Sequence, residues 1–187
     1  MTDRERHQRG NQPGHGHATH TAHSQHKAQG PERVSCAVIT CSDTRTPDTD
    51  TSGQLMIRLL KERGHEVAAY HLIKDEPEQI RRRIQEAVGS DHIQAILING
   101  GTGISRRDST FEAVNALLEK KLDGFGEIFR YLTYKDIGSP AIMTRATAGV
   151  LRGRIVISTP GSEAAVRLAM EKLILPELPH MVQQITT

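Results

Sequence analysis

The sequence predicts an α/β domain of three layers, in which a mostly parallel β-sheet lies between helices on both faces. Short apolar runs typical of buried strands alternate with amphipathic helical segments, and the 187-residue chain has the length of about one domain. A third observation concerns the core. Because the chain has three Phe, three Tyr and no Trp, its interior must be built from aliphatic side chains.

Two strands and the helix between them are expected at the start of the domain. Residues 34–40 form a short apolar run typical of a buried strand. Thr51 or Ser52 can cap the helix that follows, and Gly64 ends it. The loosely alternating residues 66–74 predict the second strand. Alternation of this kind predicts parallel strands joined by helices.

The same alternation continues to the end of the chain. Pro77 fits the first turn of a second helix, whose apolar stripe stops at Gly89. The remaining expected elements are a strand at 94–99, a helix at 110–120, mixed helix and turn at 124–150, a strand at 154–159, and a final helix at 162–175 that stops at Pro176.

Composition excludes several classes of protein. A net charge of +2, from 24 basic and 22 acidic residues, is too balanced for a surface that binds nucleic acid or membrane. Charged residues rather than an apolar signal segment follow Met1, and no apolar run approaches the length of a membrane span. Cys36 and Cys41 would lie about 16 Å apart along a strand, too far for a disulfide. We therefore expect a cytoplasmic protein with reduced cysteines.

Residues 1–32 differ in composition from residues 33–187. The first segment is rich in Gln, Gly and His and lacks apolar periodicity, which predicts a disordered tail before the α/β domain. Its histidine spacings can ligate a metal ion, although a solvated tail without a metal explains them as well. Six of the ten histidines lie in this tail, namely His7, His15, His17, His20, His23 and His26.

Polar or glycine-rich segments follow each expected strand. Ligands of parallel α/β sheets bind at the carboxyl ends of the strands, so we expect these segments to meet at one edge of the sheet. They are Ser42-Asp43-Thr44, Asp75-Glu76, residues 99–108 and Pro160-Gly161-Ser162.

The segment Gly100-Gly101-Thr102-Gly103 leaves a buried strand. Its glycines permit positive φ angles, and its amides with the Thr102 hydroxyl suit a phosphate or the heteroatoms of a pterin. A dinucleotide-binding fingerprint is excluded because Arg106 stands where a third glycine is needed, and the lysine of a P-loop is absent. This disfavours an oxidoreductase that uses nicotinamide or flavin. A simple turn between strand and helix explains the glycines equally.

Two arginines and two aspartates at this edge have the chemistry to handle phosphate. Arg106 and Arg107 can clamp phosphate oxygens or form a basic pair on the surface. Asp108 is a salt-bridge partner or a ligand of hydrated Mg²⁺, and Asp75 is a second magnesium ligand or a helix cap. One or two carboxylates together with substrate phosphates are the usual way in which proteins hold Mg²⁺.

The remaining polar loops each have a binding and a structural interpretation. Asp43 can orient a ligand amine or form an Asx turn, whereas Asp50 and Ser52 suit the cap of the first helix. Pro160-Gly161-Ser162 places a helix N-terminus directly after a strand, which makes either an anion site or a simple cap.

Taken in order, the motifs resemble the MoaB/MogA family of molybdenum-cofactor biosynthesis proteins, and most closely its MoaB branch. The resemblance spans residues 34–184 and leaves out the histidine-rich tail. It implies a MogA-like molybdopterin-binding domain that assembles as a trimer or hexamer. The motifs are S-D-T and D-T-S-G within 42–53, N-G-G-T-G at 99–103, R-R-D-S-T at 106–110, G-F-G-E at 124–127 and T-P-G-S at 159–162.

The resemblance also implies a reaction. Active members transfer AMP from Mg-ATP to the terminal phosphate of molybdopterin and release pyrophosphate; a member that only binds pterin is the alternative, and a molybdate-inserting enzyme is the expected downstream partner. The family's two functional aspartates, with Mg²⁺ as cofactor, fall on Asp75 and Asp108. The residues expected to bind the pterin and nucleotide are Ser42, Asp43, Ser52, Gly53, Gly100, Gly101, Thr102, Gly103, Arg107, Thr144, Arg145, Pro160, Gly161 and Ser162.

Overall fold

The computed structural model describes residues 30–186. The tail predicted to be disordered, residues 1–32, lies outside this range except for residues 30–32. Its histidines, the possible metal ligands, all lie outside it. The elements are β1 (Ser35–Cys41), α2 (Thr51–Glu62), β2 (Glu66–Ile73), α3 (Pro77–Val88), β3 (Ala95–Asn99), α4 (Thr110–Leu117), β4 (Lys120–Lys121), α5 (Asp123–Ile137), the 3₁₀ helix η1 (Ser139–Met143), β5 (Thr147–Leu151), β6 (Arg154–Thr159), α6 (Glu163–Ala169), the π-helical segment η2 (Met170–Ile174) and α7 (Leu175–Thr186).

One six-stranded sheet, in the order β2-β1-β3-β6-β5-β4, runs through the centre of the domain. Strands β2, β1, β3 and β6 are parallel, as expected, and each connection between them contains at least one helix. Strands β5 and β4 add an antiparallel edge. Arg152 and Gly153, both with positive φ, form the tight turn between β5 and β6.

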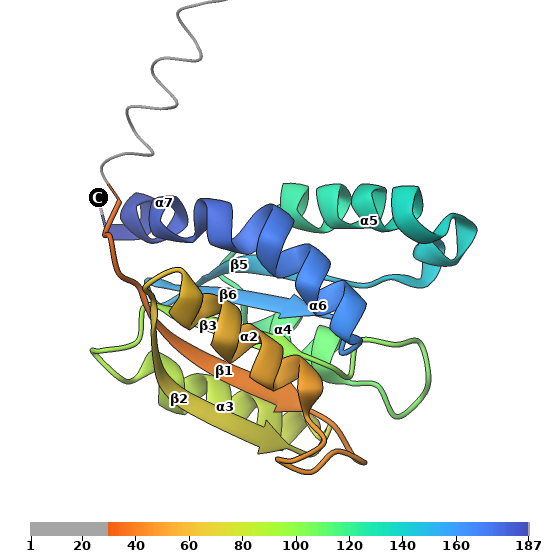
Figure 1. Ribbon diagram of the computed structural model, residues 1–187. Helices are drawn as coiled ribbons and strands as arrows, with labels where there is room; N and C mark the ends of the chain where they lie inside the picture. Colours follow the sequence, from red (N-terminus) through yellow and green to blue (C-terminus); the bar gives the residue numbers. More distant parts are fainter. Residues whose placement is uncertain (1–29, 187) are drawn as a thin grey trace, which may run out of the picture.

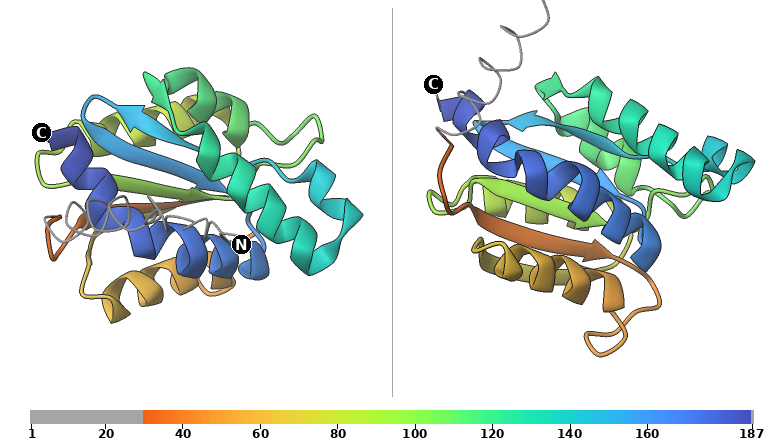
Figure 2. Two further views of the ribbon diagram at one scale, coloured as in Figure 1. Left: turned by 90° about the horizontal axis from the view of Figure 1, so that it is seen from above. Right: turned by 45° about the horizontal axis from the view of Figure 1, so that its top comes forward.

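Helices cover both faces of the sheet, which confirms the three-layer architecture (Figures 1 and 2). One core lies under α2, α5, α6 and α7 and contains Leu60, Phe129 and Met170. The other lies under α3 and α4 and contains Ile84 and Val114. Among residues 30–186, no helix is both long enough and apolar enough to cross a membrane.

The structure corrects two boundaries and one assignment. The helix expected at 110–120 ends at Leu117, and residues 124–150, expected as mixed helix and turn, contain the long helix α5 and strand β5. The final helix does not stop at Pro176 but continues to Thr186. Pro176 has no backbone N–H to donate to the preceding turn. The π-helical segment Met170–Ile174 just before it changes the hydrogen-bond pattern of the helix at this point.

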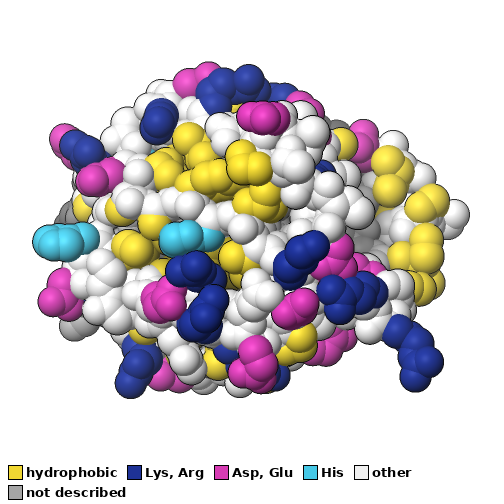
Figure 3. All heavy atoms as spheres, turned by 90° about the horizontal axis from the view of Figure 1, so that it is seen from below, with side chains coloured by type: hydrophobic (Ala, Val, Ile, Leu, Met, Phe, Trp, Pro, Cys, Tyr) yellow, Lys and Arg dark blue, Asp and Glu magenta, His cyan; other side chains and the backbone are white. Residues whose placement is uncertain are grey.

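The parallel strands end at one edge and so position the loops that follow them. Cys41 at the end of β1 pairs in register with Ile73 of β2, and Thr40 pairs with Asn99 of β3, which in turn pairs with Thr159 of β6. The segments after these four strands must therefore start side by side. Away from this edge, on the side of strand β2, acidic and basic side chains are interspersed (Figure 3), and this face carries no continuous basic surface of the kind that binds nucleic acid.

Candidate functional site

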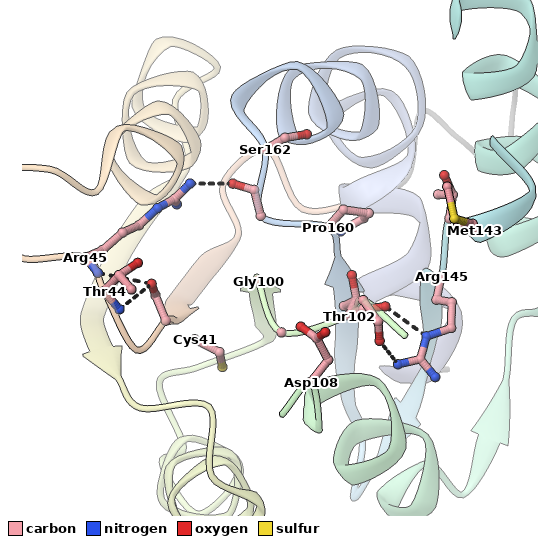
Figure 4. Close-up of a pocket in the computed structure, with 15 residues that line it drawn as sticks. Cys41, Thr44, Arg45, Gly100, Thr102, Asp108, Met143, Arg145, Pro160 and Ser162 are labelled. Atoms are coloured by element: carbon pink, nitrogen blue, oxygen red, sulfur yellow. Dashed lines mark hydrogen bonds between the residues drawn. The ribbon is translucent and has the colours of Figure 1, made fainter. Parts of the chain in front are cut away.

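A cleft of about 470 Å³ lies at the carboxyl edge of β1, β3 and β6 (Figure 4). Three of its walls are the loops that follow these strands, and the fourth is the segment between η1 and β5. The residues that line it are Cys41, Ser42, Thr44, Arg45, Gly100, Gly101, Thr102, Gly103, Asp108, Met143, Thr144, Arg145, Pro160, Gly161 and Ser162.

The glycine-rich loop passes too close to its neighbours for side chains. Gly100 has φ +95°, and a Cβ there would lie 2.2 Å from the carbonyl oxygen of Cys41. Gly101 has φ +61°, and its Cβ would lie 2.2 Å from Asp75 Oδ2. Both residues must therefore be glycine, because both the backbone angle and the space require it. Because these positions lack side chains, the backbone of the loop is open to a ligand.

Arg145 holds this loop from the far side of the cleft. Its Nε donates to the Thr102 carbonyl at 2.8 Å, and its Nη2 donates to the Gly103 carbonyl. The same guanidinium pairs with Glu112 and lies 4.9 Å from the centre of the Phe111 ring. The hydrogen bond from Arg145 lowers the pKa of Glu112. Arg145 therefore stabilises the glycine-rich loop rather than offering a free cation to a ligand.

The loop between β6 and α6 is held by α2 and by the loop that precedes α2. Arg45 Nη2 and Ser52 Oγ both donate to the Gly161 carbonyl, each at 2.7 Å. Arg45 is itself paired with Asp50 at 3.0 Å, and Asp50 is completely buried. Of the expected caps, Asp50 is confirmed, since it accepts from the Gly53 amide at the start of α2. Thr51 and Ser52, the other candidates, lie inside the helix, and the Ser52 hydroxyl donates to Gly161 instead. This chain of contacts fixes one wall of the cleft to the first helix.

Asp108 carries the carboxylate that lines the cleft, and its side chain points into it (Figure 4). Its Oδ2 accepts from the Ser105 amide at 3.1 Å, which closes the turn after the glycine-rich loop. A Cβ at Gly103 would lie 2.6 Å from the same oxygen, so this carboxylate packs directly on the loop.

Asp75 lies beneath the loop and not in the cleft lining. Its Oδ1 accepts from the Ser109 amide at 3.2 Å, the Ser109 hydroxyl at 2.9 Å and the Thr110 hydroxyl at 3.1 Å. Its own amide donates to Asp43 Oδ1 at 3.2 Å. The Asp75 carboxylate therefore anchors the start of α4, and it lies against Gly101 without lining the cleft.

Asp43 and Arg107 form an ion pair outside the cleft lining. Arg107 Nε and Nη2 contact the two carboxylate oxygens of Asp43 at 2.7 and 3.1 Å. The hydrogen bond from Arg107 lowers the pKa of Asp43. This pair joins the loops that follow β1 and β3 across the edge of the sheet.

The Cys41 thiol in the cleft is poorly suited to act as a nucleophile. Burial raises the pKa of Cys41 to about 12, so this thiol stays protonated at neutral pH. Cys36 is buried and is also a free thiol, as expected for two cysteines that cannot meet.

Comparison with known proteins decides the family. The family described as "Probable molybdopterin binding domain" matches residues 37–180. The chain belongs to the MoaB/MogA family of molybdopterin-binding proteins.

Its similarity to this family extends over almost the whole length of the relatives. The chain is 55% identical over 162 residues to molybdenum cofactor biosynthesis protein B of Bacillus subtilis (strain 168), covering 86% of this chain and 95% of the relative. The crystal structure of a molybdenum cofactor biosynthesis protein B is 50% identical, with a TM-score of 0.82, and covers 84% of this chain and 99% of that one. The tungsten cofactor synthesizing protein MoaB of Pyrococcus furiosus is 34% identical, with a TM-score of 0.77 and coverage of 84% and 99%.

In this MoaB/MogA domain, most of the sequence-predicted site residues meet in the cleft. Five of them do not line it: Asp43, Ser52, Gly53, Asp75 and Arg107. Four lining residues were missed by the sequence analysis. Arg45 gave a signal, as the basic residue inside a polar loop. Cys41 and Met143 are direct neighbours of residues that were predicted, and Thr44 lies in the polar segment 42–44 that was expected at this edge.

Proposed function

We propose that this chain binds molybdopterin in the cleft and transfers AMP from ATP to its terminal phosphate. The observation that carries the proposal is the position of Asp108, whose carboxylate lies in the cleft against the glycine-rich loop. Membership of the MoaB/MogA family, whose relatives include molybdenum cofactor biosynthesis protein B of Bacillus subtilis, supports the same pathway.

The cleft suits a phosphate ester through its backbone and hydroxyl groups. Arg45 and Arg145 donate to carbonyl groups of the protein, so phosphate oxygens are left with the loop amides and with hydroxyls such as those of Thr44, Thr102 and Thr144. The terminal phosphate oxygen of molybdopterin then attacks the α-phosphorus of ATP, and the bond from that phosphorus to the bridging oxygen breaks to release pyrophosphate. The substrate supplies the nucleophile, so an unreactive Cys41 thiol fits this reaction.

The residues of the cleft fit a Mg²⁺ ion that is held by one or two carboxylates together with substrate phosphates. Among residues 30–186 there is no group of three or more His, Cys, Asp or Glu side chains that encloses a metal. Asp108 offers a carboxylate to the cleft, and one or two carboxylates with substrate phosphates suffice for this ion. Bound there, Mg²⁺ supplies positive charge against the repulsion between the two phosphates. Asp75, the other aspartate that the family resemblance implies, is the second proposed ligand; its Oδ2 lies against Gly101.

A second candidate function is pterin binding without catalysis. The observation that favours it is the hydrogen bonding of Asp75, because three donors already contact Oδ1 and this carboxylate does not line the cleft.

Pyrophosphate release distinguishes the two functions. Purified full-length protein incubated with molybdopterin, ATP and Mg²⁺ is expected to release pyrophosphate in proportion to adenylylated molybdopterin, and to release none when molybdopterin is left out. Retention of molybdopterin on ultrafiltration is measured in parallel. Retention without any pyrophosphate would reject the adenylyltransferase and establish the binding protein.

We also propose that the domain assembles as a homo-oligomer. Large apolar side chains are exposed along α5 and η1, namely Ile128, Tyr131, Tyr134, Ile137 and Ile142. Soluble monomers rarely expose an apolar surface of this kind, and a contact with a second copy of the chain would bury it. Sedimentation velocity of the purified protein is expected to show a trimer or hexamer, and Ile128→Lys with Tyr131→Glu is expected to lower its mass. A monomeric parent protein contradicts the proposal.

A further inference from the structure

A chain of hydrogen bonds runs from β2, at the outer edge of the sheet, to the loop before α6. The Tyr70 hydroxyl, on β2, donates to Asp50 Oδ2 at 2.6 Å. Asp50 Oδ1 accepts from Arg45 Nη1 at 3.0 Å, and Arg45 Nη2 donates to the Gly161 carbonyl at 2.7 Å (Figure 4). Tyr70 does not line the cleft, so it can act on a ligand there only through this chain.

The carboxylate in the middle of the chain is tightly enclosed. Asp50 is completely buried, and a Cβ at Gly53 would lie 2.1 Å from Asp50 Oδ2 and 2.6 Å from Thr40 Oγ1. Asp50 Oδ1 also accepts from the Gly53 amide at 3.0 Å. A buried carboxylate that loses a donor keeps an unsatisfied acceptor. Removal of the Tyr70 hydroxyl therefore changes how Asp50 contacts its remaining partners.

Tyr70 is suited to be the fixed end of this chain. Its side chain is half-buried against the core under α2, and its backbone pairs with Val38 of β1. Burial raises the pKa of Tyr70, and the bond to Asp50 raises it further, so the hydroxyl remains a donor at neutral pH. A side chain on a paired strand is a more rigid support than one on a loop, such as Arg45.

Gly161, at the other end of the chain, lies against the glycine-rich loop. A Cβ at Gly161 would lie 2.9 Å from Gly100 Cα, and both residues line the cleft. The Gly100 amide donates to the Thr159 carbonyl at 3.1 Å. A shift of Gly161 therefore changes the spacing between two walls of the cleft. A displacement of about 1 Å caused by a distant substitution can lower an enzyme's rate by about 100-fold.

We propose that Tyr70 is a positioning residue for the ligand of the cleft. Its hydroxyl orients Asp50, Asp50 orients Arg45, and Arg45 holds the Gly161 wall in place before a ligand arrives. The inference rests on the proposed function, which identifies that ligand as molybdopterin. It adds a residue of β2 that belongs to none of the loops around the cleft.

A double-mutant cycle on molybdopterin affinity tests this role. Tyr70→Phe removes only the hydroxyl. Arg45→Lys keeps a positive charge beside Asp50 but lacks the planar fork that contacts Asp50 and Gly161 together. The dissociation constant is measured by ultrafiltration of the full-length protein, at a temperature at which urea unfolding shows every variant to be folded. Ile84→Val is the control, because it loosens the core under α3 without touching the chain of hydrogen bonds.

Each single variant is expected to raise the dissociation constant about fivefold or more, and Ile84→Val is expected to leave it within about twofold of the parent value. Because both residues act through one chain, the double variant should bind no more weakly than the weaker single variant. Losses that multiply in the double variant, or parent-like affinity in Tyr70→Phe, overturn the positioning role. An equal loss in Ile84→Val overturns it too, because stability alone would then explain the effect.

The parent protein separates this role from the proposed function. A parent protein that retains molybdopterin but releases no pyrophosphate rejects only the proposed AMP transfer, since the affinity cycle does not depend on that reaction. A parent protein that retains no molybdopterin rejects the proposed function, and the role of Tyr70 fails with it.

Discussion

Asp108→Asn is expected to lower the rate of AMP transfer by about 1,000-fold while molybdopterin remains bound. Asn keeps an oxygen that can accept from the Ser105 amide, so the turn after the glycine-rich loop is retained. The negative charge that the cleft offers to Mg²⁺ is lost. Pyrophosphate release measured over a range of Mg²⁺ concentrations, beside ultrafiltration with molybdopterin, separates the two effects.

The matched control for this variant is Asp91→Asn. Asp91 is exposed and lies in the turn before β3, at the opposite edge of the sheet from the cleft, so both activities are expected to stay at the level of the parent protein. Parallel loss of transfer and pterin retention in Asp108→Asn would show that Asp108 holds the loop or the pterin rather than a metal.

The parallel part of the fold could be predicted because its signals are local. The expected strands at 34–40, 66–74, 94–99 and 154–159 each overlap a strand of the structure within one or two residues. Their apolar runs end at polar or glycine-rich segments. The antiparallel strand Thr147–Leu151 contains Ala and Gly and shows no clear alternation, and its pairing with β6 is specified by tertiary contacts that a local pattern does not contain.

Which loops form the cleft could be predicted, but not which partner each charged side chain takes. Arg107 has the chemistry of a phosphate clamp, yet it pairs with Asp43 from another loop. Arg145 likewise contacts two carbonyl groups and Glu112. Residue type determines what a side chain can bind, whereas the crossing of loops at the sheet edge determines what it reaches. For the same reason Asp75, expected to face the ligand, lies against Gly101 but does not line the cleft.

Asp50→Ala is expected to lower the free energy of unfolding by about 3–5 kcal/mol and the melting temperature by about 10 °C. The buried carboxylate accepts from the Tyr70 hydroxyl at 2.6 Å and the Gly53 amide at 3.0 Å, and it pairs with Arg45. Removing it leaves these donors without their acceptor and takes the cap from α2. Urea unfolding at pH 7 measures the loss. Asp48→Ala, at an exposed position of the same loop, is the control and is expected to change stability by less than about 0.5 kcal/mol.

The stability gap between the parent protein and Asp50→Ala is expected to depend on pH in a defined direction. Burial raises the pKa of Asp50, but hydrogen bonds from Thr40, Tyr70 and the Gly53 amide, with the charge of Arg45, outweigh it and leave this pKa below its ordinary value. A carboxylate with a lowered pKa contributes stability above the pKa of the unfolded chain, near 4, and loses it as the pH falls through the pKa of the folded state. The gap should therefore be constant between about pH 6 and 8 and narrow below about pH 4. A stability gap that widens on acidification would mean that Asp50 is protonated in the folded protein. Its ion pair with Arg45, which donates to the Gly161 carbonyl, would then not hold this wall of the cleft.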